Sequence, residues 1–303
     1  MAHEETVYEA LDHADSGEGQ WAFGTGFDDP LSGVDTTVPD GIDPADLGAY
    51  CLMLGDDALV LAQRLTQWIT AAPELEEEVA IANIALDLLG QARLLLARAG
   101  SVGVLGRSRQ LATTSIPDED ALAYFRDPDE FLNSPLVEAP NGDFGQTMVR
   151  LLAAATVRLA LFAGLRDSRD PVLAAIAAKG VHELTSHRDH AARWVLRLGD
   201  GTPESHRRAQ QGADAVWPLL AEVFATTDVE RRLTAARVAV DPASAREEVT
   251  GVLTAVLERA TLRVPDWPSD APPRGRTGQH GPELTELLGG LQGLAREHPA
   301  ATW

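Results

Sequence analysis

Histidines gather in one part of the chain, and that residue type raises the question of a metal site. Four of the eight lie close together in the sequence: His182, His187, His190 and His206. A carboxylate and an imidazole three residues apart on a helix point the same way, so a Glu-x-x-His pair can hold one metal ion. A di-iron site in a four-helix bundle needs one Glu on each of two helices and Glu-x-x-His on each of the other two.

The Glu-x-x-His pattern does not occur in this sequence. None of the residues three positions before a histidine is Glu, and His3 has no such neighbour; the seven are Ala10, Lys179, Leu184, His187, Pro203, Thr277 and Ala295. Asp87 has Gly90 at i+3, and glycine offers no ligand atom. Glu183 has Ser186 at i+3, with His187 displaced to i+4. We therefore expect no catalytic residue, no cofactor-binding residue and no metal site in this chain.

The polar residues left on the expected core helices are interpreted as a degenerate version of such a centre. We expect a hydrogen-bonded polar core that consists of Asp57, Asn83, Asp87, Gln91, Glu183 and His187. Asn83, Asp87 and Gln91 follow one another at i, i+4 and i+8, so they form one polar stripe on the second long helix. Buried polar groups without partners are costly, so the members of this set must satisfy one another.

Asp56 and Asp57 pose the same choice between a structural and a chemical role. Arg64 lies seven residues after Asp57, on the same face of the expected helix. We therefore expect a buried ion-pair network here that includes Arg150 or Arg158. Such networks are more often structural than catalytic, so we favour the structural role. Neither a Walker A loop nor a G-x-S-x-G elbow occurs in the sequence.

Capping residues and apolar spacing predict an all-α fold around four long core helices. Asp-Pro pairs open helices at residues 43 and 170, because Asp caps the helix and Pro suits its first turn. The second helix is apolar on nearly every side between Val79 and Leu96, which predicts burial among other helices. The four expected long helices span about 43–70, 73–100, 144–165 and 171–198; shorter ones span about 118–126, 202–224, 241–261 and 283–297.

The first 42 residues differ in character from the rest of the chain. They are rich in Asp, Glu and Gly and carry scattered aromatic residues, among them Trp21, Phe23 and Phe27. We expect residues 1–42 to be a flexible acidic arm, either a solvating tail or a segment that wraps a partner subunit. Residues 43–303 are expected to form a single helical domain.

Charge and cysteine content exclude several classes of partner. The chain has 25 Lys and Arg against 46 Asp and Glu, so its net charge is −21 with His neutral. Nucleic acids and anionic membrane surfaces attract cationic proteins, so we expect neither as a partner. The single cysteine, Cys51, cannot form an intrachain disulfide, and we expect it to be a small core residue in a reducing compartment.

Targeting signals are not evident either. No uninterrupted apolar run reaches the roughly 18 residues of a membrane span, and the strongest candidate, Leu151 to Leu165, contains Arg158. The first Lys or Arg is Arg64, so the N-terminus lacks the positive region of a signal peptide. We expect a cytoplasmic protein, whose acidity fits either ordinary solubility with G+C-rich codon usage or adaptation to high salt.

Several long strings, in order, resemble the C-type family of bacterial phenylacetyl-CoA epoxidase subunits. They are YCLMLGDDALVLAQRLTQW (50–68), PELEEEVAIANIALDLLGQAR (73–93), PNGDFGQT (140–147), RLGDGTPESHRR (197–208) and GRTGQHGPELTELLGGLQ (275–292). The resemblance covers about residues 45–303 and leaves the N-terminal arm outside it.

This resemblance implies a ferritin-like helical fold and membership of a hetero-oligomeric monooxygenase of phenylacetate catabolism. In that family a related A-type subunit holds the di-iron centre and epoxidises the aromatic ring of phenylacetyl-CoA with O2, and electrons come from a separate reductase. The C-type subunit is the non-catalytic structural partner, and further B-type components belong to the complex. The missing Glu-x-x-His pairs agree with that role.

Two alternatives from other classes stay open on the sequence. One is an autonomous ferritin-like metalloprotein that uses Asp56 or Asp57 together with Asp87, Glu183 and His187. The other is a self-associating helical structural protein without an oxygenase partner. The acyl-CoA substrate of the complex, its stoichiometry and its interface residues are likewise open.

Overall fold

The computed structural model describes residues 31, 33–104, 116–299 and 301, and all regular structure in these ranges is helical. The four long helices are α1 (Pro44–Thr66), α2 (Leu75–Ser101), α6 (Phe144–Leu165) and α7 (Pro171–Gly199). The other α-helices are α4 (Asp118–Tyr124), α5 (Pro135–Glu138), α8 (Pro203–Val216), α9 (Asp228–Ala235), α10 (Arg246–Arg259) and α11 (Pro282–Glu297). Short 3-10 helices are η1 (Pro128–Glu130), η2 (Trp217–Ala221), η3 (Pro242–Ala245) and η4 (Gly275–Thr277).

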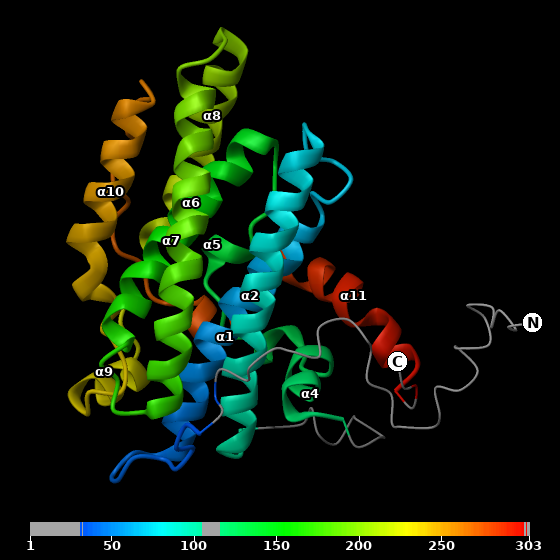
Figure 1. Cartoon of the computed structure of the whole chain (residues 1–303), viewed down its shortest axis with the longest axis vertical. Helices are drawn as coiled ribbons and strands as arrows, with labels where there is room; N and C mark the ends of the chain where they lie inside the picture. Colours follow the sequence, from blue (N-terminus) through cyan, green and yellow to red (C-terminus); the bar gives the residue numbers. More distant parts are fainter. Residues whose placement is uncertain (1–30, 32, 105–115, 300, 302–303) are drawn as a thin grey trace, which may run out of the picture.

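The four long helices form the bundle, and the others cover it (Figure 1). The helix α1 packs along α2 and α6 packs along α7, while α2 also contacts α7. The helices α8 and α10 lie against the α6–α7 side, whereas α4 and α11 lie on the α1–α2 side. Leucine, alanine and valine from all four long helices form one continuous core with few aromatic residues. The predicted all-α bundle with four long core helices and extra C-terminal helices is confirmed.

Most predicted helix starts are confirmed by their caps. The side chain of Asp43 accepts a hydrogen bond from Ala45 N, that of Asp143 from Gln146 N and that of Asp170 from Leu173 N. Each bond satisfies one backbone N–H that lacks a partner within the helix.

Two of the predicted helix ends were wrong. The first long helix ends at Thr66 and not near Thr70, which has a φ of 88° in the turn that follows. The helix predicted over about 202–224 stops at Val216, because Pro218 lacks the N–H needed to continue it, and the chain tightens into η2.

The second long helix is not buried on every side, which corrects the prediction made from its apolar residues. One face packs on α1 and α7, but Leu75, Val79, Leu86 and Leu89 on the opposite face are exposed. Within the described residues, α2 and α6 are long and apolar enough to pass a composition test for membrane spans. That test is weak evidence, because α6 is a buried core helix of the bundle.

The predicted boundary between arm and domain falls close to the start of α1. Residues 1–30 and 32 of the arm lie outside the described residues. In the part of the arm that is described, Val34, Val38 and Ile42 pack partly buried against the core. The buried Arg98 donates to the Thr36 carbonyl oxygen at 2.6 Å, which fixes this part of the chain to α2.

Candidate functional site

The centre of the bundle is occupied by the guanidinium group of Arg158, which projects from the middle of α6. Its Nε donates to Gln91 Oε1 on α2 at 2.8 Å, and its Nη1 donates to the Leu54 carbonyl oxygen on α1 at 2.9 Å. Gln91 Nε2 in turn donates to Glu183 Oε2 on α7 at 2.8 Å. Arg158, Gln91 and Glu183 form what we call the central cluster, and through it one cation links all four long helices.

Arg158 and Gln91 of the central cluster are buried and Glu183 is partly buried, and this sets the electrostatics of the cluster. Burial lowers the pKa of Arg158 to about 10, against the opposing attraction of Asp57 and Glu183, so the side chain stays charged at neutral pH. The guanidinium carbon also lies 4.4 Å from the centre of the Phe162 ring, a favourable cation–π distance. Arg158 therefore places a fixed positive charge at the middle of the bundle.

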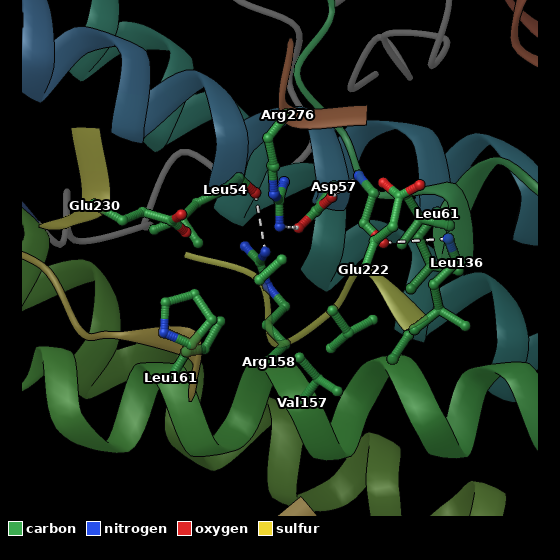
Figure 2. Close-up of a pocket in the computed structure, with 16 residues that line it drawn as sticks. Leu54, Asp57, Leu61, Leu136, Val157, Arg158, Leu161, Glu222, Glu230 and Arg276 are labelled. Carbon is green, nitrogen blue, oxygen red and sulfur yellow. Dashed lines mark hydrogen bonds and ion pairs between the residues drawn. The ribbon is translucent and has the colours of Figure 1, made fainter. Parts of the chain in front are cut away.

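A small cavity adjoins Arg158 (Figure 2). Its volume is about 40 Å³, and its charged lining residues besides Arg158 are Asp57, Glu222, Glu230 and Arg276. Arg158 Nη2 is buried without a hydrogen-bond partner among the described residues. A cavity of this size has room for about three water molecules, which could complete the hydrogen bonds of Nη2.

Asp57 is not hydrogen-bonded to the central cluster. Its Oδ2 accepts from Arg276 Nη2 at 2.7 Å, and its Oδ1 accepts from the backbone N–H of Ser134 at 2.8 Å. Arg276 also donates to two backbone carbonyl oxygens, those of Met53 and Leu132. Asp57 thus holds the C-terminal segment and the loop before α5 against α1.

The expected stripe on the second long helix lies only partly in the core. Gln91 is buried, the Asp87 side chain is 43% exposed and Asn83 is exposed, so the placement of Asn83 in a polar core was wrong. The stripe winds from the bundle centre out to the surface, because steps of four residues do not match whole turns of the helix.

His187 pairs with Asp87 at the edge of the bundle. Its Nε2 lies 3.0 Å from Asp87 Oδ2, and its Nδ1 is buried without a partner among the described residues. Burial lowers the pKa of His187 despite the attraction of Asp87, which favours the neutral imidazole. His190, one turn further along α7, lies 3.2 Å from a different carboxylate, Glu77, so the two histidines do not share a partner.

The buried acids on α1 find other partners than those expected. Asp56 receives both Nη atoms of Arg126, one of them at 3.0 Å, and also the backbone N–H of Leu132 at 2.9 Å. Arg64 donates to the carbonyl oxygens of Glu138 and Glu283, and it joins no ion pair with another described residue. A buried ion-pair network at Asp56 and Asp57 exists, but its cations come from segments far along the chain.

Arg150, the other expected cation, also binds neutral groups. It donates to the Ala139 carbonyl oxygen and to Asn141 Oδ1. Cys51 is buried in the core as expected, and burial raises the pKa of its thiol.

The residues at the bundle centre do not fit a di-iron group. Such a group needs carboxylates on all four helices and an imidazole on two of them. Here α6 contributes the Arg158 guanidinium and α2 contributes the Gln91 amide, while Asp87 faces the surface. In the ranges that the structure describes, no three His, Cys, Asp or Glu side chains converge as metal ligands. A fixed guanidinium at this point would repel a divalent cation.

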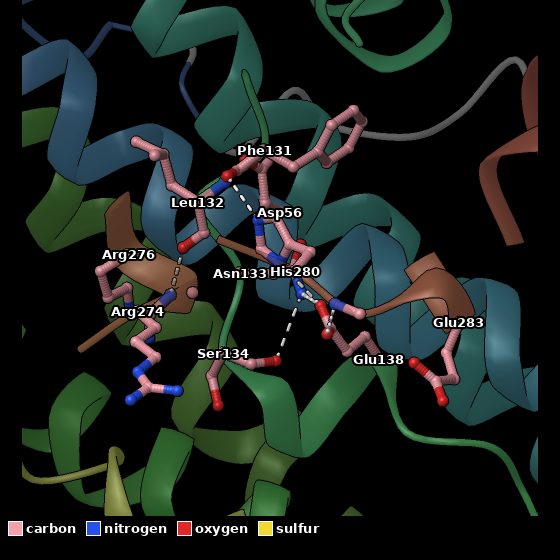
Figure 3. Close-up of polar contacts among 12 residues, drawn as sticks. Asp56, Phe131, Leu132, Asn133, Ser134, Glu138, Arg274, Arg276, His280 and Glu283 are labelled. Carbon is pink, nitrogen blue, oxygen red and sulfur yellow. Dashed lines mark hydrogen bonds and ion pairs between the residues drawn. The ribbon is translucent and has the colours of Figure 1, made fainter. Parts of the chain in front are cut away.

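A second polar cluster joins the C-terminal segment to the loop before α5 (Figure 3). His280 Nε2 donates to the Phe131 carbonyl oxygen at 2.8 Å, and its Nδ1 lies 2.7 Å from Glu138 Oε2. Glu138 also accepts from Asn133 Nδ2 at 2.9 Å and from Gly281 N at 3.2 Å. We call His280 and Glu138 the C-terminal clasp, because both ring nitrogens of His280 face acceptors and the cationic form satisfies both.

The C-terminal clasp predicts a pH-dependent contribution to stability. Burial disfavours the imidazolium, but the bonds to Glu138 and Phe131 and the negative charge of Glu138 raise the pKa of His280 overall. This contribution is complete below the pKa of histidine in the unfolded chain and is lost as pH rises through the raised folded pKa. Its size is about 1.5–3 kcal/mol, typical of a hydrogen bond to a charged group.

Urea denaturation of the wild type and of His280→Asn, at pH 6 and at pH 8.5, measures this contribution. The stability difference between the two proteins should be larger at pH 6. His298→Asn is the control, because His298 is exposed and its side chain bonds to no other residue in the described part of the chain. A stability difference that is equal at both pH values would contradict the cationic clasp.

Sequence reasoning missed the cations and the histidine that complete these clusters. Arg126, Arg276, Glu138 and His280 carry no local spacing signal, because each meets its partner across many residues. The only signal was the string GRTGQHG at 275–281, which contains Arg276 and His280 and pointed to the family but not to these contacts.

Comparison with known proteins adds a family relationship to this geometry. Residues 36–303 match the family described as phenylacetic acid catabolic protein. The chain is also 40% identical, over 257 residues, to the C subunit of 1,2-phenylacetyl-CoA epoxidase from Escherichia coli (strain K12). That alignment covers 85% of this chain and 99% of the relative. The resemblance seen in the sequence is thereby confirmed, and the helical bundle is the ferritin-like fold of that family.

Proposed function

Because the chain belongs to the phenylacetic acid catabolic protein family, we propose that it is the non-catalytic structural subunit of a phenylacetyl-CoA 1,2-epoxidase. The complex would act in aerobic phenylacetate catabolism in the cytoplasm. A related subunit would hold the di-iron centre, and a reductase would supply electrons, with B-type components as further members. This chain would hold no cofactor and would give the complex its stability and geometry.

The central cluster is the observation that carries the proposal. Arg158 sits where the four long helices converge, hydrogen-bonded to α1 and α2, and Gln91 extends the contact to Glu183 on α7. A permanent cation and an amide in these positions leave neither the ligands nor the charge balance for iron. A bundle of the di-iron type whose centre lacks the iron ligands supports a structural role for this chain.

The exposed apolar face of α2 supports the pairing. Leu75, Val79, Leu86 and Leu89 are large apolar residues that remain in water in the single chain. An exposed apolar surface with polar surroundings is typical of a protein interaction site. Phenylacetyl-CoA is strongly anionic, and a chain with a net charge of −21 would repel it, so the substrate pocket belongs on the partner.

The non-catalytic role predicts that removing the metal-like residues leaves catalysis intact. The variant Glu183→Gln, His187→Asn, assembled with the catalytic subunit, should turn over phenylacetyl-CoA within about twofold of the wild type. Thermal unfolding and size exclusion would check that the variant folds and assembles. A loss of about a hundredfold in turnover by a folded, assembled variant would contradict the non-catalytic role and place Glu183 and His187 in a working site.

A further inference from the structure

Apolar residues on the outer face of α2, four of them exposed and Ala82 partly buried, form a seam with a defined spacing. Leu75, Val79, Ala82, Leu86 and Leu89 are separated by steps of four, three, four and three residues. Leu75 is 71% exposed and Leu86 is 63% exposed, so the seam points into water. Steps that alternate between three and four place apolar residues along one narrow line, the pattern by which helices pack side by side as in coiled coils.

Hollows beside this seam provide space for the side chains of another helix. Two of them, of about 310 and 300 Å³, share Leu59, Leu86, Leu89 and Tyr124. A third hollow of about 410 Å³ adjoins them at Tyr124 and extends over α11 to Leu294, which is also exposed. The seam and these hollows together make one apolar groove, bounded by α1, α4 and α11.

An acidic residue lies inside this apolar groove. Asp120 on α4 lines two of the hollows, and it makes no hydrogen bond or ion pair in the described part of the chain. Burial and the neighbouring Glu119 raise the pKa of Asp120, with Arg93 opposing them. A cation placed in the groove would relieve both the desolvation and the repulsion of Asp120.

The charges around the groove decide between possible occupants. Glu74 and Glu76 are exposed at one end of the seam, and Glu119 and Asp120 lie near the other. Arg93 also lines the groove, but it lies 3.5 Å from Glu119, so the groove stays acidic on balance. In a symmetric pair of this chain the same surface would face itself, so acidic residues would meet acidic residues. A complementary occupant is a different helix with an apolar face and basic residues beside it.

We propose that the catalytic subunit lays a long amphipathic helix along the α2 seam and places an Arg or Lys side chain against Asp120. This inference rests on the proposed function, since it names the surface by which the two chains would pair. Leu86 and Leu89 interlock with apolar residues of the partner helix, and Asp120 fixes its position along the groove.

Binding of the purified catalytic subunit to variants of this chain tests the inference. Leu86→Arg should weaken binding by about a hundredfold, as expected for a central interface residue. Asp120→Asn should weaken it by about tenfold, and less so at high salt, because a partly buried ion pair is lost. Ala255→Arg and Glu248→Gln are matched controls at exposed positions of α10, and both should bind like the wild type.

The outcomes separate this inference from the proposed function. If the wild type binds the catalytic subunit and Leu86→Arg binds equally well, the contact lies elsewhere; the inference is overturned and the pairing stands. If the wild type does not bind at all, the proposed pairing itself fails. Sedimentation of the isolated chain and flotation with anionic vesicles test the other occupants. Self-association or vesicle binding that Leu86→Arg abolishes would overturn the inference in favour of a second copy or a membrane.

Discussion

The Asp56→Asn variant is expected to unfold with a free energy about 3–5 kcal/mol below that of the wild type. Asp56 is fully buried and receives two Nη atoms of Arg126, which is itself 3% exposed. Asparagine keeps the shape of the side chain but removes its charge, so the guanidinium is left buried without a counter-ion. The intact buried pair adds little net stability, because its attraction barely exceeds the cost of desolvating the two charges. The large loss comes from leaving the Arg126 charge buried without its partner.

Urea denaturation at neutral pH measures this effect. Asp270→Asn is the matched control, because Asp270 pairs with Arg246 at 2.6 Å but the two side chains are 69% and 39% exposed. Exposed pairs contribute at most about 1 kcal/mol. Equal losses for Asp56→Asn and Asp270→Asn would show that Arg126 finds another partner or water once Asp56 is neutral.

Replacing Gly278 by alanine is the second change with a large expected effect, a loss of about 3 kcal/mol that sums two costs. Gly278 has a φ of 77°, a left-handed conformation that costs other residues about 1–2 kcal/mol. A Cβ atom at this position would also overlap the carbonyl oxygen of Asp129, and overpacking of this kind costs about 1–3 kcal/mol. Gly278 lies between Arg276 and His280, so the strain acts on the segment that carries the partners of Asp57 and Glu138.

Gly289→Ala is the control for this variant. Gly289 lies within α11, and a Cβ atom there would meet nothing within 4 Å. Alanine should therefore stabilise the protein by up to about 1 kcal/mol, since it is the better helix former. Melting temperatures that shift equally in both variants would contradict the close packing of the C-terminal segment.

The order and approximate extent of the long helices could be predicted from sequence because their signals are local. The caps at Asp43, Asp143 and Asp170 act within three residues of themselves, and the helices they open follow as predicted. Short helices such as α5 and α9 were not predicted, because elements of one or two turns depend on contacts made elsewhere in the chain.

The exposure of α2 could not be predicted from its residues. A leucine that its own chain covers and a leucine that stays exposed cannot be told apart by residue type, so a helix that is apolar on nearly every side was predicted to be buried. The heptad spacing of Leu75, Val79, Leu86 and Leu89 was present in the sequence, but only the structure shows that nothing in the described chain covers it.

The sequence predicted most of the residues of the candidate site, but only some of the contacts between them. Gln91, Glu183, Asp87 and His187 do form hydrogen-bonded contacts between α2 and α7, as expected. Arg158, the cation at the centre, was expected only as one of two candidates, with Arg150, for an ion-pair network at Asp56 and Asp57; it hydrogen-bonds Gln91 and Leu54 instead. Interior partners of this kind depend on how helices rotate against one another, and no sequence spacing fixes that rotation.

The most direct test of the central claim is the distribution of iron in the assembled complex. The chain would be co-expressed with the catalytic subunit, and the iron content of each separated chain would be measured together with O2-dependent turnover of phenylacetyl-CoA in the presence of a reductase. We predict that iron is confined to the catalytic subunit and that turnover requires both chains. Stoichiometric iron in this chain would contradict the account, because Arg158 would then have to leave the centre of the bundle.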